Sequence, residues 1–378
     1  MRIVIVTGIF PPDMGGPATY VPLIASALAL KSHSVAVVTL SEHGVHDDSA
    51  YPFEVVRIRR RQPRGRRVLA TIATVWRLGR RADLAYLNGL VLEGIIACKL
   101  LARRPVVIKA VTDLIWERAH SHGSTSASID DFGRRRHPLK WEVLKCLQAW
   151  YVRAGNLVIV PSRFLARIVS GWGIPVDRIA IVPNAVPLPP PSAVEPSFDL
   201  VTVARLVEGK GLASLIRLAA GNGWSLKIVG DGPLRRSLQA VAEGSGAGER
   251  IVFTGRVPAD EVVRHLRSAR LFVLNSSHEG LPHAVLEAKA AGVAVAAAAV
   301  GGTPEVINDG VDGVLYDVHD EPGMVRVVRR LLGDEAERHR LAAAGSEHVG
   351  RDFSIPEMVE ATERALITIA GACAAGVS

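Results

Sequence analysis

Two glutamates stand at positions where their side chains could hold an activated, hydroxyl-bearing small molecule. Glu279 and Gly280 follow the apolar run Ala269 to Leu274, which is typical of a buried strand, and a helix is predicted to begin at Pro282. Ligands of parallel α/β proteins bind in such loops, outside the carboxyl ends of the strands. We therefore expect Glu279 to face a ligand.

The predicted helix adds groups that suit an anion. Backbone amides over residues 280–284, among them those of Gly280 and Leu281, should point out of its first turn towards a negative charge. Glu287 comes eight residues after Glu279, roughly one turn inside the helix at about 1.5 Å rise per residue. Carboxylates suit hydroxyls and amides suit phosphates, and a sugar nucleotide carries both. The alternative is a solvated Glu279 and a Glu287 that only favours the helix dipole.

Two cations follow another predicted strand, residues 199–203. Arg205 and Lys210 lie in the loop between this strand and the next helix, so they should share an edge of the sheet with Glu279. The guanidinium of Arg205 can bind phosphate oxygens through two N–H groups at once, and the ammonium of Lys210 is a compact positive charge. Together they suit a diphosphate. Ordinary surface charge is the alternative for this spacing.

Length and composition set the frame for these residues. With 378 residues and 48% hydrophobic content, the chain suits two globular domains. The three cysteines are scattered, which favours neither a disulfide framework nor a zinc site and fits a reducing cytoplasm. We expect no signal peptide, because the N-terminal apolar stretch is short, and no membrane span, because no run reaches about 18 apolar residues.

Positive charge is concentrated in the first half of the chain. Residues 1–190 hold 26 Lys and Arg against 13 Asp and Glu, although the whole chain has a net charge of +8. Seven arginines fall within Arg57–Arg67, directly before an apolar helical segment, so we expect this run and its flanks to favour an anionic membrane surface. Nucleic acid is less favoured, because no aromatic residues interleave the arginines. A merely solvated basic surface is the remaining alternative.

Strands and helices alternate twice along the chain. We predict an N-terminal domain over residues 1–185 and a C-terminal domain over 186–354, separated by a proline-rich linker, with a helix at about 355–370 that packs back on the first domain. Two such alternations predict two doubly wound parallel sheets, of the Rossmann-like type, that face each other across a cleft.

The first domain contributes further candidates at predicted strand ends. Gly15 and Gly16 follow the first strand and let backbone approach a ligand closely. Lys109 lies on the strand 106–111, while Asp113 and Glu117 follow it and are four residues apart, on one face of any helix that begins there. Residues 119–137 are polar and rich in Gly and Ser, so we expect a loop.

Several motifs occur in one order along the chain. They are PPDMGGPATYV, VPNAV, VARLVEGKGL, IVGDGP, FTGRV, HEGLPHAVLEAKAAG and VGGTPEVINDGVDGVLYDV. In this set and order the chain resembles the family 4 retaining glycosyltransferases of the GT-B fold over nearly its whole length, most specifically over residues 199–318. The resemblance implies transfer of a hexose-type sugar, with retention of configuration, from a UDP- or GDP-linked donor to a glycan or lipid-linked acceptor. Together with the basic first half of the chain, the motifs favour work at the cytoplasmic face of a membrane.

The same resemblance implies roles for individual residues. The second domain would hold most of the donor and the first domain the acceptor. No metal or other cofactor is expected, because cations and amides would neutralise the leaving diphosphate. By position, Arg205 and Lys210 would hold the diphosphate, and Gly16 would lie near its β-phosphate. Glu279 would contact the donor sugar, with the amides of Gly280 and Leu281 near the sugar and the phosphates. Glu287 would hold the ribose, and Arg256 and Val257 would meet the base.

One position departs from the family pattern. Many members carry a His near the sugar after the strand that corresponds to 106–111, and here no His precedes His120. Asp113 is our first candidate to replace it and Glu117 the second, with Lys109 beside them on the acceptor side. The alternatives are a nucleotide-sugar epimerase or hydrolase of the same fold, or a non-catalytic transferase-like subunit.

Overall fold

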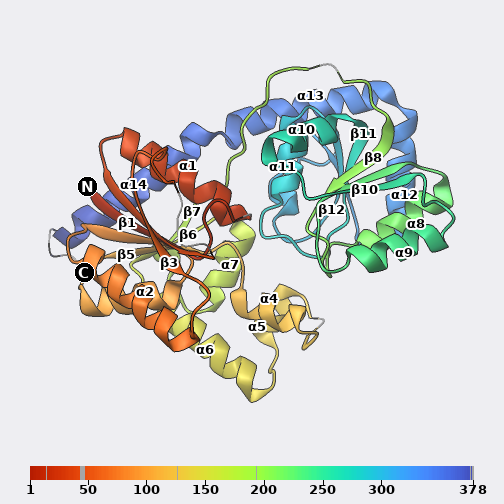
Figure 1. Ribbon diagram of the computed structural model, residues 1–378. Helices are drawn as coiled ribbons and strands as arrows, with labels where there is room; N and C mark the ends of the chain where they lie inside the picture. Colours follow the sequence, from red (N-terminus) through yellow and green to blue (C-terminus); the bar gives the residue numbers. More distant parts are fainter. Residues whose placement is uncertain (14, 43–46, 126, 193, 375, 377–378) are drawn as a thin grey trace. The chain divides into compact units, whose positions relative to one another are not determined.

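The computed structural model describes residues 1–13, 15–42, 47–125, 127–192, 194–374 and 376. It divides into two compact units, and the chain passes from the first to the second between Val182 and Pro183, just before the predicted boundary. The first unit also includes the chain from Val359 onwards, and the second includes Ser162–Phe164. Each unit has its own parallel sheet (Figure 1).

The first unit is built on seven parallel strands in the order β3-β2-β1-β4-β5-β6-β7. Its central strands are continuous apolar runs, as burial on both faces requires. From β1 the chain adds β2 and β3 on one side of the sheet and only later adds β4 on the other side. The order of strand addition therefore reverses between β1 and β4, and this place is called the reversal point below. The strands are β1 (Arg2–Thr7), β2 (Ser34–Ser41), β3 (Glu54–Arg59), β4 (Leu84–Asn88), β5 (Val106–Lys109), β6 (Leu157–Val160) and β7 (Ile179–Ile181).

Helices connect these strands, and two regions differ from the sequence prediction. No helix was predicted over 91–101, and residues 119–137 were predicted as a loop, but part of each region is helical. The loop prediction was wrong because Ser128 caps a short helix by accepting a bond from the Asp131 amide at 3.1 Å. The helical segments are α1 (Gly16–Leu30), α2 (Arg64–Gly79), α3 (Val91–Gly94), η1 (Ile95–Leu101), α4 (Leu114–Ser121), α5 (Ile129–Arg134), α6 (Leu139–Arg153), α7 (Arg163–Gly171) and η2 (Val176–Arg178).

The last helix, α14 (Ile355–Ala374), carries the chain back to the first unit. Glu363 of α14 accepts bonds from Lys31 at 2.6 Å and lies 2.9 Å from His33 Nε2, both just after α1. The C-terminal part of α14 is therefore held on the first unit beside α1 by polar contacts.

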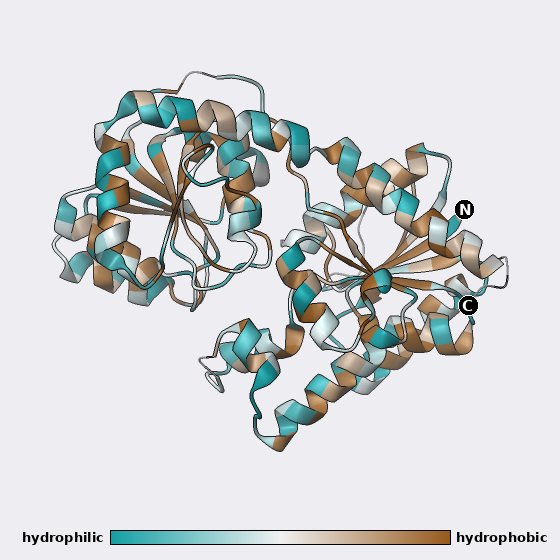
Figure 2. Cartoon of the chain, turned by 180° about the vertical axis from the view of Figure 1, so that it is seen from behind, coloured by the Kyte–Doolittle hydropathy of each residue, from teal (hydrophilic) through white to brown (hydrophobic). Residues whose placement is uncertain are grey.

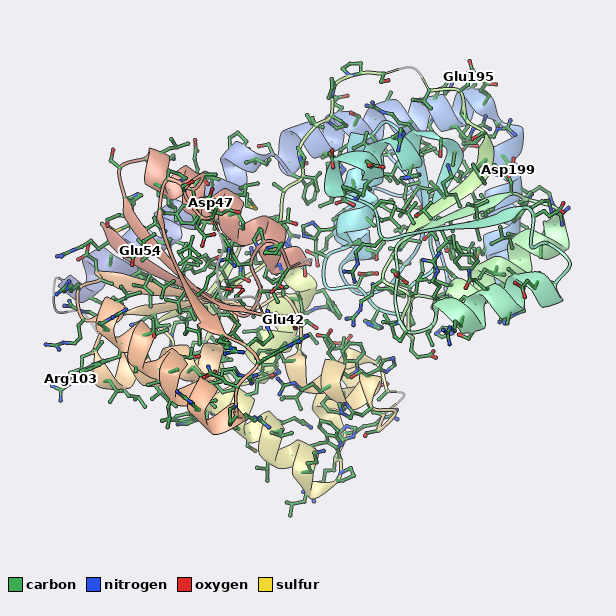
Figure 3. The ribbon with its side chains drawn as sticks, in the orientation of Figure 1. Glu42, Asp47, Glu54, Arg103, Glu195 and Asp199 are labelled. Atoms are coloured by element: carbon green, nitrogen blue, oxygen red, sulfur yellow. The ribbon has the colours of Figure 1, made fainter. Side chains whose placement is uncertain are left out.

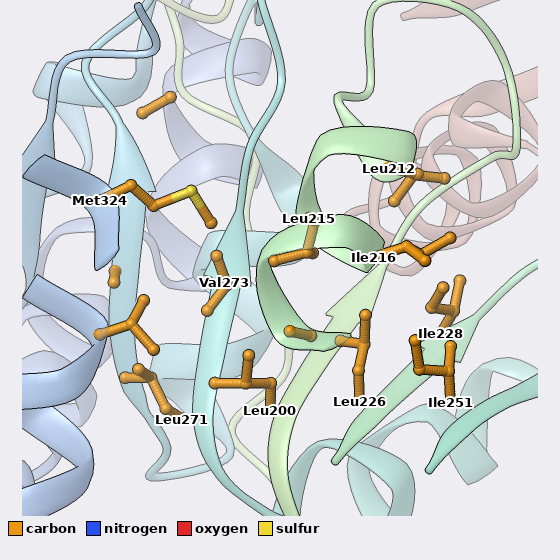
Figure 4. Packing of buried hydrophobic residues seen from close by; sticks show 14 of the residues in the cluster. Leu200, Leu212, Leu215, Ile216, Leu226, Ile228, Ile251, Leu271, Val273 and Met324 are labelled. Atoms are coloured by element: carbon orange, nitrogen blue, oxygen red, sulfur yellow. The ribbon is translucent and has the colours of Figure 1, made fainter. Parts of the chain in front are cut away.

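The second unit is built on six parallel strands in the order β10-β9-β8-β11-β12-β13. Its reversal point, where the order of strand addition changes side, lies between β8 and β11. Leu200, Leu226 and Leu271 pack under Leu215 and Ile216 of α8, which covers one face of the sheet (Figure 4). The strands are β8 (Phe198–Val203), β9 (Leu226–Val229), β10 (Ile251–Gly255), β11 (Ala269–Leu274), β12 (Ala294–Ala298) and β13 (Val314–Tyr316).

One helical region of the second unit is divided. Residues 321–350 were predicted as helical throughout, but Asp334 ends one helix and caps the next, since its Oδ1 accepts a bond from the Glu337 amide at 2.8 Å. The helical segments are α8 (Leu212–Asn222), α9 (Arg235–Gly244), α10 (Ala259–Arg267), α11 (His283–Ala290), η3 (Thr303–Glu305), α12 (Glu321–Gly333) and α13 (Glu335–Asp352).

Hydropathy follows the same plan in both units. The strands are largely hydrophobic along their length, whereas the helices alternate between hydrophobic and hydrophilic residues (Figure 2). Sheets buried on both faces and helices buried on one face give this pattern. The predicted pair of doubly wound parallel sheets is confirmed.

Candidate active site

The predicted donor residues lie at the carboxyl edge of the second sheet, at the reversal point between β8 and β11. The loop after β8 carries Arg205 and Lys210, and the loop after β11 carries Glu279. Because β8 and β11 are adjacent parallel strands, their loops lie side by side. This reversal point is where doubly wound sheets bind their ligands.

Direct bonds join these two loops. The Ser277 amide donates to the Gly209 carbonyl at 2.8 Å, and Asn275 Nδ2 donates to the Gly211 carbonyl at 3.2 Å. Lys210 Nζ donates to Glu279 Oε1 at 2.7 Å. Lys210 and Glu279, predicted as site residues in separate loops, form one ion pair.

Glycine is required where the two loops meet. Gly211 has φ 63° and begins α8, and a Cβ at this position would overlap the carbonyl of Asn275. Gly301, in the loop after β12, has φ 54°, and a Cβ there would overlap the carbonyl of Glu279. Both positions therefore need a residue that tolerates left-handed backbone and has no side chain.

The remaining loops of this edge are joined in the same way. The Gly302 amide donates to the Glu279 carbonyl at 2.9 Å, the Leu206 amide to Asp231 at 3.0 Å, and the Gly230 amide to Gly255 at 3.0 Å. Five successive loops thus form one hydrogen-bonded rim, in the order of the strands below them. This rim holds Glu279 on one side through the bond from Gly302 to its backbone and on the other through the bond from Lys210 to its side chain.

Charge at the rim is only partly neutralised. The Lys210–Glu279 pair is half-buried, with side-chain exposures of 23% and 12%, and Lys210 keeps two further N–H donors beyond its bond to Glu279. The exposed Arg205 side chain forms no hydrogen bond or ion pair with any residue that the structure describes. One free guanidinium and one shared ammonium are available to an anion beside a carboxylate.

Two of the predicted amides, those of Gly280 and Leu281, lie just before α11, whose N-cap is Pro282. Within the described chain, the backbone N–H groups of Gly280 and Leu281 donate to no protein acceptor. Glu287 lies further along α11, where burial raises the pKa of its carboxyl to about 7, and no described cation pairs with it. A desolvated carboxylate without a partner is suited to accept bonds from ligand hydroxyls.

Arg256 and Val257 follow β10, at the outer end of the same rim. Arg256 is exposed, and Val257 packs against the apolar layer beneath the sheet. They are separated from Lys210 by the loop after β9, since the order of strands is β10-β9-β8. This spacing leaves room for a group larger than a diphosphate along the rim.

The first unit carries the other predicted residues at its own carboxyl edge. Gly15 has φ 141° and precedes α1, whereas Gly16 is the first residue of α1 and has no atom within 4 Å of where a Cβ would lie. The unusual conformation thus belongs to Gly15, and the open space belongs to Gly16.

Lys109 is buried at the end of β5. Its side chain is 5% exposed, and Nζ lies 4.5 Å from the centre of the Tyr20 ring and 3.4 Å from the Val182 carbonyl oxygen. Burial lowers the pKa of the ammonium to about 7. Lys109 is therefore a weakly solvated amine inside the first unit.

Asp113 and Glu117 have different environments. Asp113 caps α4: its Oδ1 accepts bonds from the Ile115 and Trp116 amides, both at 3.0 Å, and from Gln148 Nε2 at 3.1 Å. Glu117, one turn later, is exposed. The observed partners of Asp113 are structural, and its catalytic assignment stays a prediction.

Some residues that shape these sites were not predicted from the sequence. Asn275 and Ser277 bond the two central loops, and Gln148 holds Asp113, but none of them was singled out. For Asn275, a polar residue directly after an apolar strand was an available signal. Among the described residues, no cluster of three His, Cys, Asp or Glu side chains is placed to hold a metal ion.

Two family models match the chain. Residues 15–185 match the model described as a glycosyl transferase 4-like domain, and residues 190–348 match the model described as glycosyl transferases group 1. The two matches are consecutive and together span most of the sequence.

Curated relatives are similar over different shares of their length. The chain is 32% identical over 219 residues to the lipopolysaccharide core biosynthesis glycosyltransferase LpsD of Rhizobium meliloti, covering 56% of this chain and 63% of that protein. It is 26% identical over 380 residues to the GDP-mannose-dependent alpha-(1-6)-phosphatidylinositol monomannoside mannosyltransferase of Mycobacterium tuberculosis, covering 92% of this chain and 93% of that one.

Solved structures share the fold. HepE of Anabaena, crystallised with UDP, superposes with a TM-score of 0.77 at 20% identity, covering 97% of this chain and all of that one. Sucrose-phosphate synthase of Thermosynechococcus elongatus superposes with a TM-score of 0.80 at 18% identity, covering 98% and 99% of the two chains. At these identities the likeness shows the architecture.

Proposed function

This chain belongs to the GT4-type glycosyltransferases of the GT-B fold, and we propose that it moves a hexose-type sugar from a UDP- or GDP-linked donor to a glycan or lipid-linked acceptor. The observation that carries this proposal is the Lys210–Glu279 pair at the reversal point of the second sheet, 2.7 Å apart and beside the unpaired Arg205. Cations for a diphosphate and a carboxylate for sugar hydroxyls lie within one rim.

The reaction needs charge stabilisation more than a nucleophile. The acceptor hydroxyl oxygen bonds to the anomeric carbon, the bond from that carbon to the diphosphate oxygen breaks, and the hydroxyl proton passes to the leaving phosphate or to water. Negative charge develops on the diphosphate, where Arg205, Lys210 and the amides of Gly280 and Leu281 would stabilise it. Glu279 would hold the sugar and orient Lys210.

The remaining donor contacts follow from the rim. Glu287 would accept bonds from the ribose hydroxyls, because its carboxylate has no partner of its own. Arg256 and Val257 would border the base, and the open space at Gly16 would admit the β-phosphate. On the acceptor side we assign Lys109, with Asp113 and Glu117 as candidates for the missing His.

A donor panel tests the proposal most directly. UDP-, GDP- and ADP-linked hexoses are each added to the full chain, and binding is followed by thermal shift, since a ligand at 100 times its dissociation constant adds about 2.7 kcal/mol. The expected result is a shift with one base and transfer to a lipid-linked acceptor. NMR of the product should show the donor's anomeric configuration. Inversion would overturn the retaining assignment, and isomerised donor without transfer would indicate an epimerase.

We also propose that the protein works at the cytoplasmic face of a membrane as a peripheral protein. Relatives named for lipopolysaccharide and phosphatidylinositol mannoside synthesis support a membrane-bound acceptor. Within the described residues no helix has the length and apolar character needed to cross a bilayer.

Two arginines of the predicted basic run have partners within the first unit. Arg57 donates to Asp48 at 2.7 Å, and Arg60 donates to Asp13 and to the Gly8 carbonyl, so both fold back onto the first unit. These arginines are half-buried because strand β3 and the turn after it lie against acidic loops. The predicted surface at Arg57–Arg67 therefore shifts towards α2.

Exposed apolar residues lie between the arginines that remain. On α2, Leu69 and Trp76 are 69% and 38% exposed, and η1, which packs against α2, exposes Leu100 and Leu101. Arg103, next along the chain, extends away from the first unit (Figure 3). The neighbouring exposed cations are Arg64, Arg66, Arg77, Arg80 and Arg81.

Vesicle binding tests this surface. The full chain should co-sediment with vesicles containing an anionic lipid, more weakly at high salt, because the cations contribute about 1 kcal/mol each near such a surface. A Trp76→Ser, Leu100→Ser variant should lose most of this binding, and Val176→Ser, an exposed apolar residue elsewhere, should not. Equal sedimentation of all three would contradict the assignment.

A further inference from the structure

A small apolar cavity lies at the carboxyl edge of the first sheet, at the reversal point between β1 and β4. Its volume is about 210 Å³. It is lined by loop residues after β1 and β4, by the end of β5, and by the inner face of α6. The apolar walls include Ile9, Pro17, Val91, Ile108, Tyr151 and Val152.

One buried polar atom in this lining has no partner. Gln148 is 3% exposed, and its Nε2 donates to Asp113, but its Oε1 accepts no hydrogen bond from any described residue. Leaving a buried acceptor unpaired costs free energy, so such atoms usually have a partner in the functional state. An O–H or N–H group of a ligand in the cavity would supply it.

The size and lining of the cavity restrict the ligand. A dry apolar cavity of about 150 Å³ is large enough for benzene, so this one suits a ring with a small substituent or a short aliphatic segment. A hexose would bring several hydroxyls against apolar walls, where only Gln148 and a few other polar groups could pair with them. The site favours an apolar group with a single hydrogen-bond donor.

The helix that lines the cavity also has an exposed apolar face. Leu139, Val143, Leu147 and Trp150 are 80%, 56%, 38% and 46% exposed, and their spacing places them on one side of α6. Gln148, which lines the cavity, lies on the opposite, buried side.

Positive charge surrounds this exposed face. Arg134 and Arg136 precede α6, and Lys140 and Arg153 lie at its two ends, all exposed. Glu142 is the only acidic residue of α6 itself, and it pairs with Lys145 at 3.0 Å. An apolar stripe with a basic border is complementary to an anionic lipid surface.

We propose that the cavity binds an apolar segment of an amphiphilic acceptor, with a donor group of that acceptor on Gln148 Oε1, and that α6 rests on the lipid surface from which the acceptor comes. The cavity and the lipid surface are then separated only by one helix, about 10 Å wide. This inference rests on the proposed transfer to a lipid-linked acceptor and names the chemistry that the first unit recognises.

Small probes test the cavity without any sugar transfer. Binding of benzyl alcohol, toluene and methyl glucoside to the full chain is measured by ligand-observed NMR. We expect benzyl alcohol to bind with the highest affinity, toluene to bind more weakly, and methyl glucoside not to bind. Gln148→Met should weaken benzyl alcohol about threefold to tenfold and leave toluene unchanged. The matched control, Gln62→Met, removes a glutamine of the same unit outside the cavity and should change neither.

A second pair of measurements separates the parts of the proposal. Val152→Trp fills the cavity and should abolish binding of both aromatic probes, with circular dichroism confirming the fold. Leu147→Ser, Trp150→Ser should weaken binding to anionic vesicles severalfold while benzyl alcohol still binds. Methyl glucoside binding, or identical probe affinities in the wild type, Gln148→Met and Val152→Trp, would overturn the cavity site. Unchanged vesicle binding would overturn the role of α6.

Donor binding distinguishes this inference from the proposed function. If the nucleotide-sugar shift and sugar transfer occur but the probes do not bind, the cavity proposal fails alone. If the probes bind but no nucleotide sugar does, the transferase proposal fails and the cavity site stands.

Discussion

The two sheets reverse direction at equivalent points, yet the two reversal points have opposite character. In the second unit the loops after β8 and β11 are joined by backbone bonds and by the Lys210–Glu279 ion pair. In the first unit the loops after β1 and β4 border an apolar cavity, and the nearest cation, Lys109, is 5% exposed. The same topology therefore supports a charged rim in one unit and a largely apolar cavity in the other.

The difference lies in the residues of a few loops. In the second unit Asn275 directly follows β11 and Arg205 comes two residues after β8, whereas in the first unit Gly8 and Gly89 directly follow β1 and β4. Gly89 has φ 143°, and a Cβ there would lie 2.9 Å from the Gly8 amide nitrogen, so the backbones of these two loops approach closely. Function follows from loop chemistry, since the sheets below are alike.

The largest effect is expected from neutralising the rim. Glu279→Gln should lower the rate of sugar transfer by about 10²–10³, because the sugar loses a charged acceptor and Lys210 loses its orienting partner. Stability should change little, since the pair is partly solvated. Steady-state kinetics with saturating donor measures the loss.

A matched control separates this effect from the removal of any ion pair. Glu261→Gln breaks an exposed pair with Arg264, 2.8 Å apart in the same unit, and should leave the rate unchanged. If Glu279→Gln retained full activity, the contrast between the two reversal points would have no catalytic meaning.

Much of the second unit was predictable because its loops are short and follow clear strands. Arg205, Lys210 and Glu279 could be placed at one sheet edge because each follows a predicted parallel strand. The bond between Lys210 and Glu279 could not be predicted, because β8 and β11 are adjacent only through the reversal of the sheet. Parallel pairing between strands far apart in sequence leaves no local signal.

Replacing a glycine where the loops of the rim meet should lower the stability of the second unit. Gly211→Ala should cost the second unit about 3 kcal/mol, because the methyl group overlaps the Asn275 carbonyl and the backbone is left-handed. Gly223→Ala is the matched control: it has φ 74° but no neighbour within 4 Å, so it should cost only about 1 kcal/mol. Thermal unfolding compares the two. Equal losses would mean that the loops are not tightly joined.

The first unit offers a test of its buried amine. The pKa of Lys109 is lowered from 10.5 to about 7 by burial, so between these values the unfolded chain binds more protons than the folded one. Stability should therefore rise with pH, by about 2 kcal/mol between pH 7.5 and 9. In Lys109→Met this rise should disappear. A pH-independent wild type would mean that Lys109 is solvated.

Less of the first unit could be predicted, for a physical reason. Lys109 and Asp113 were singled out as charged residues at a strand end, but the cavity depends on Gln148, which is distant in sequence and lies on a helix. A cavity is formed by the absence of atoms between several elements. Sequence patterns report which residues are apolar and not whether they fill the space between them.

The smallest expected effect is the pH dependence of donor binding through Glu287 of the second unit. Burial raises the pKa of Glu287 from 4.5 to about 7, so the carboxyl loses its charge as pH falls below neutrality. If it binds the ribose, affinity for a nucleotide sugar should fall about tenfold from pH 8 to pH 6, because only about a tenth of the carboxyl groups remain ionised at pH 6. A nucleotide sugar serves better than a nucleoside diphosphate, whose terminal phosphate titrates in this range. Glu287→Gln should flatten the calorimetric profile, and an unchanged slope would assign the titration elsewhere.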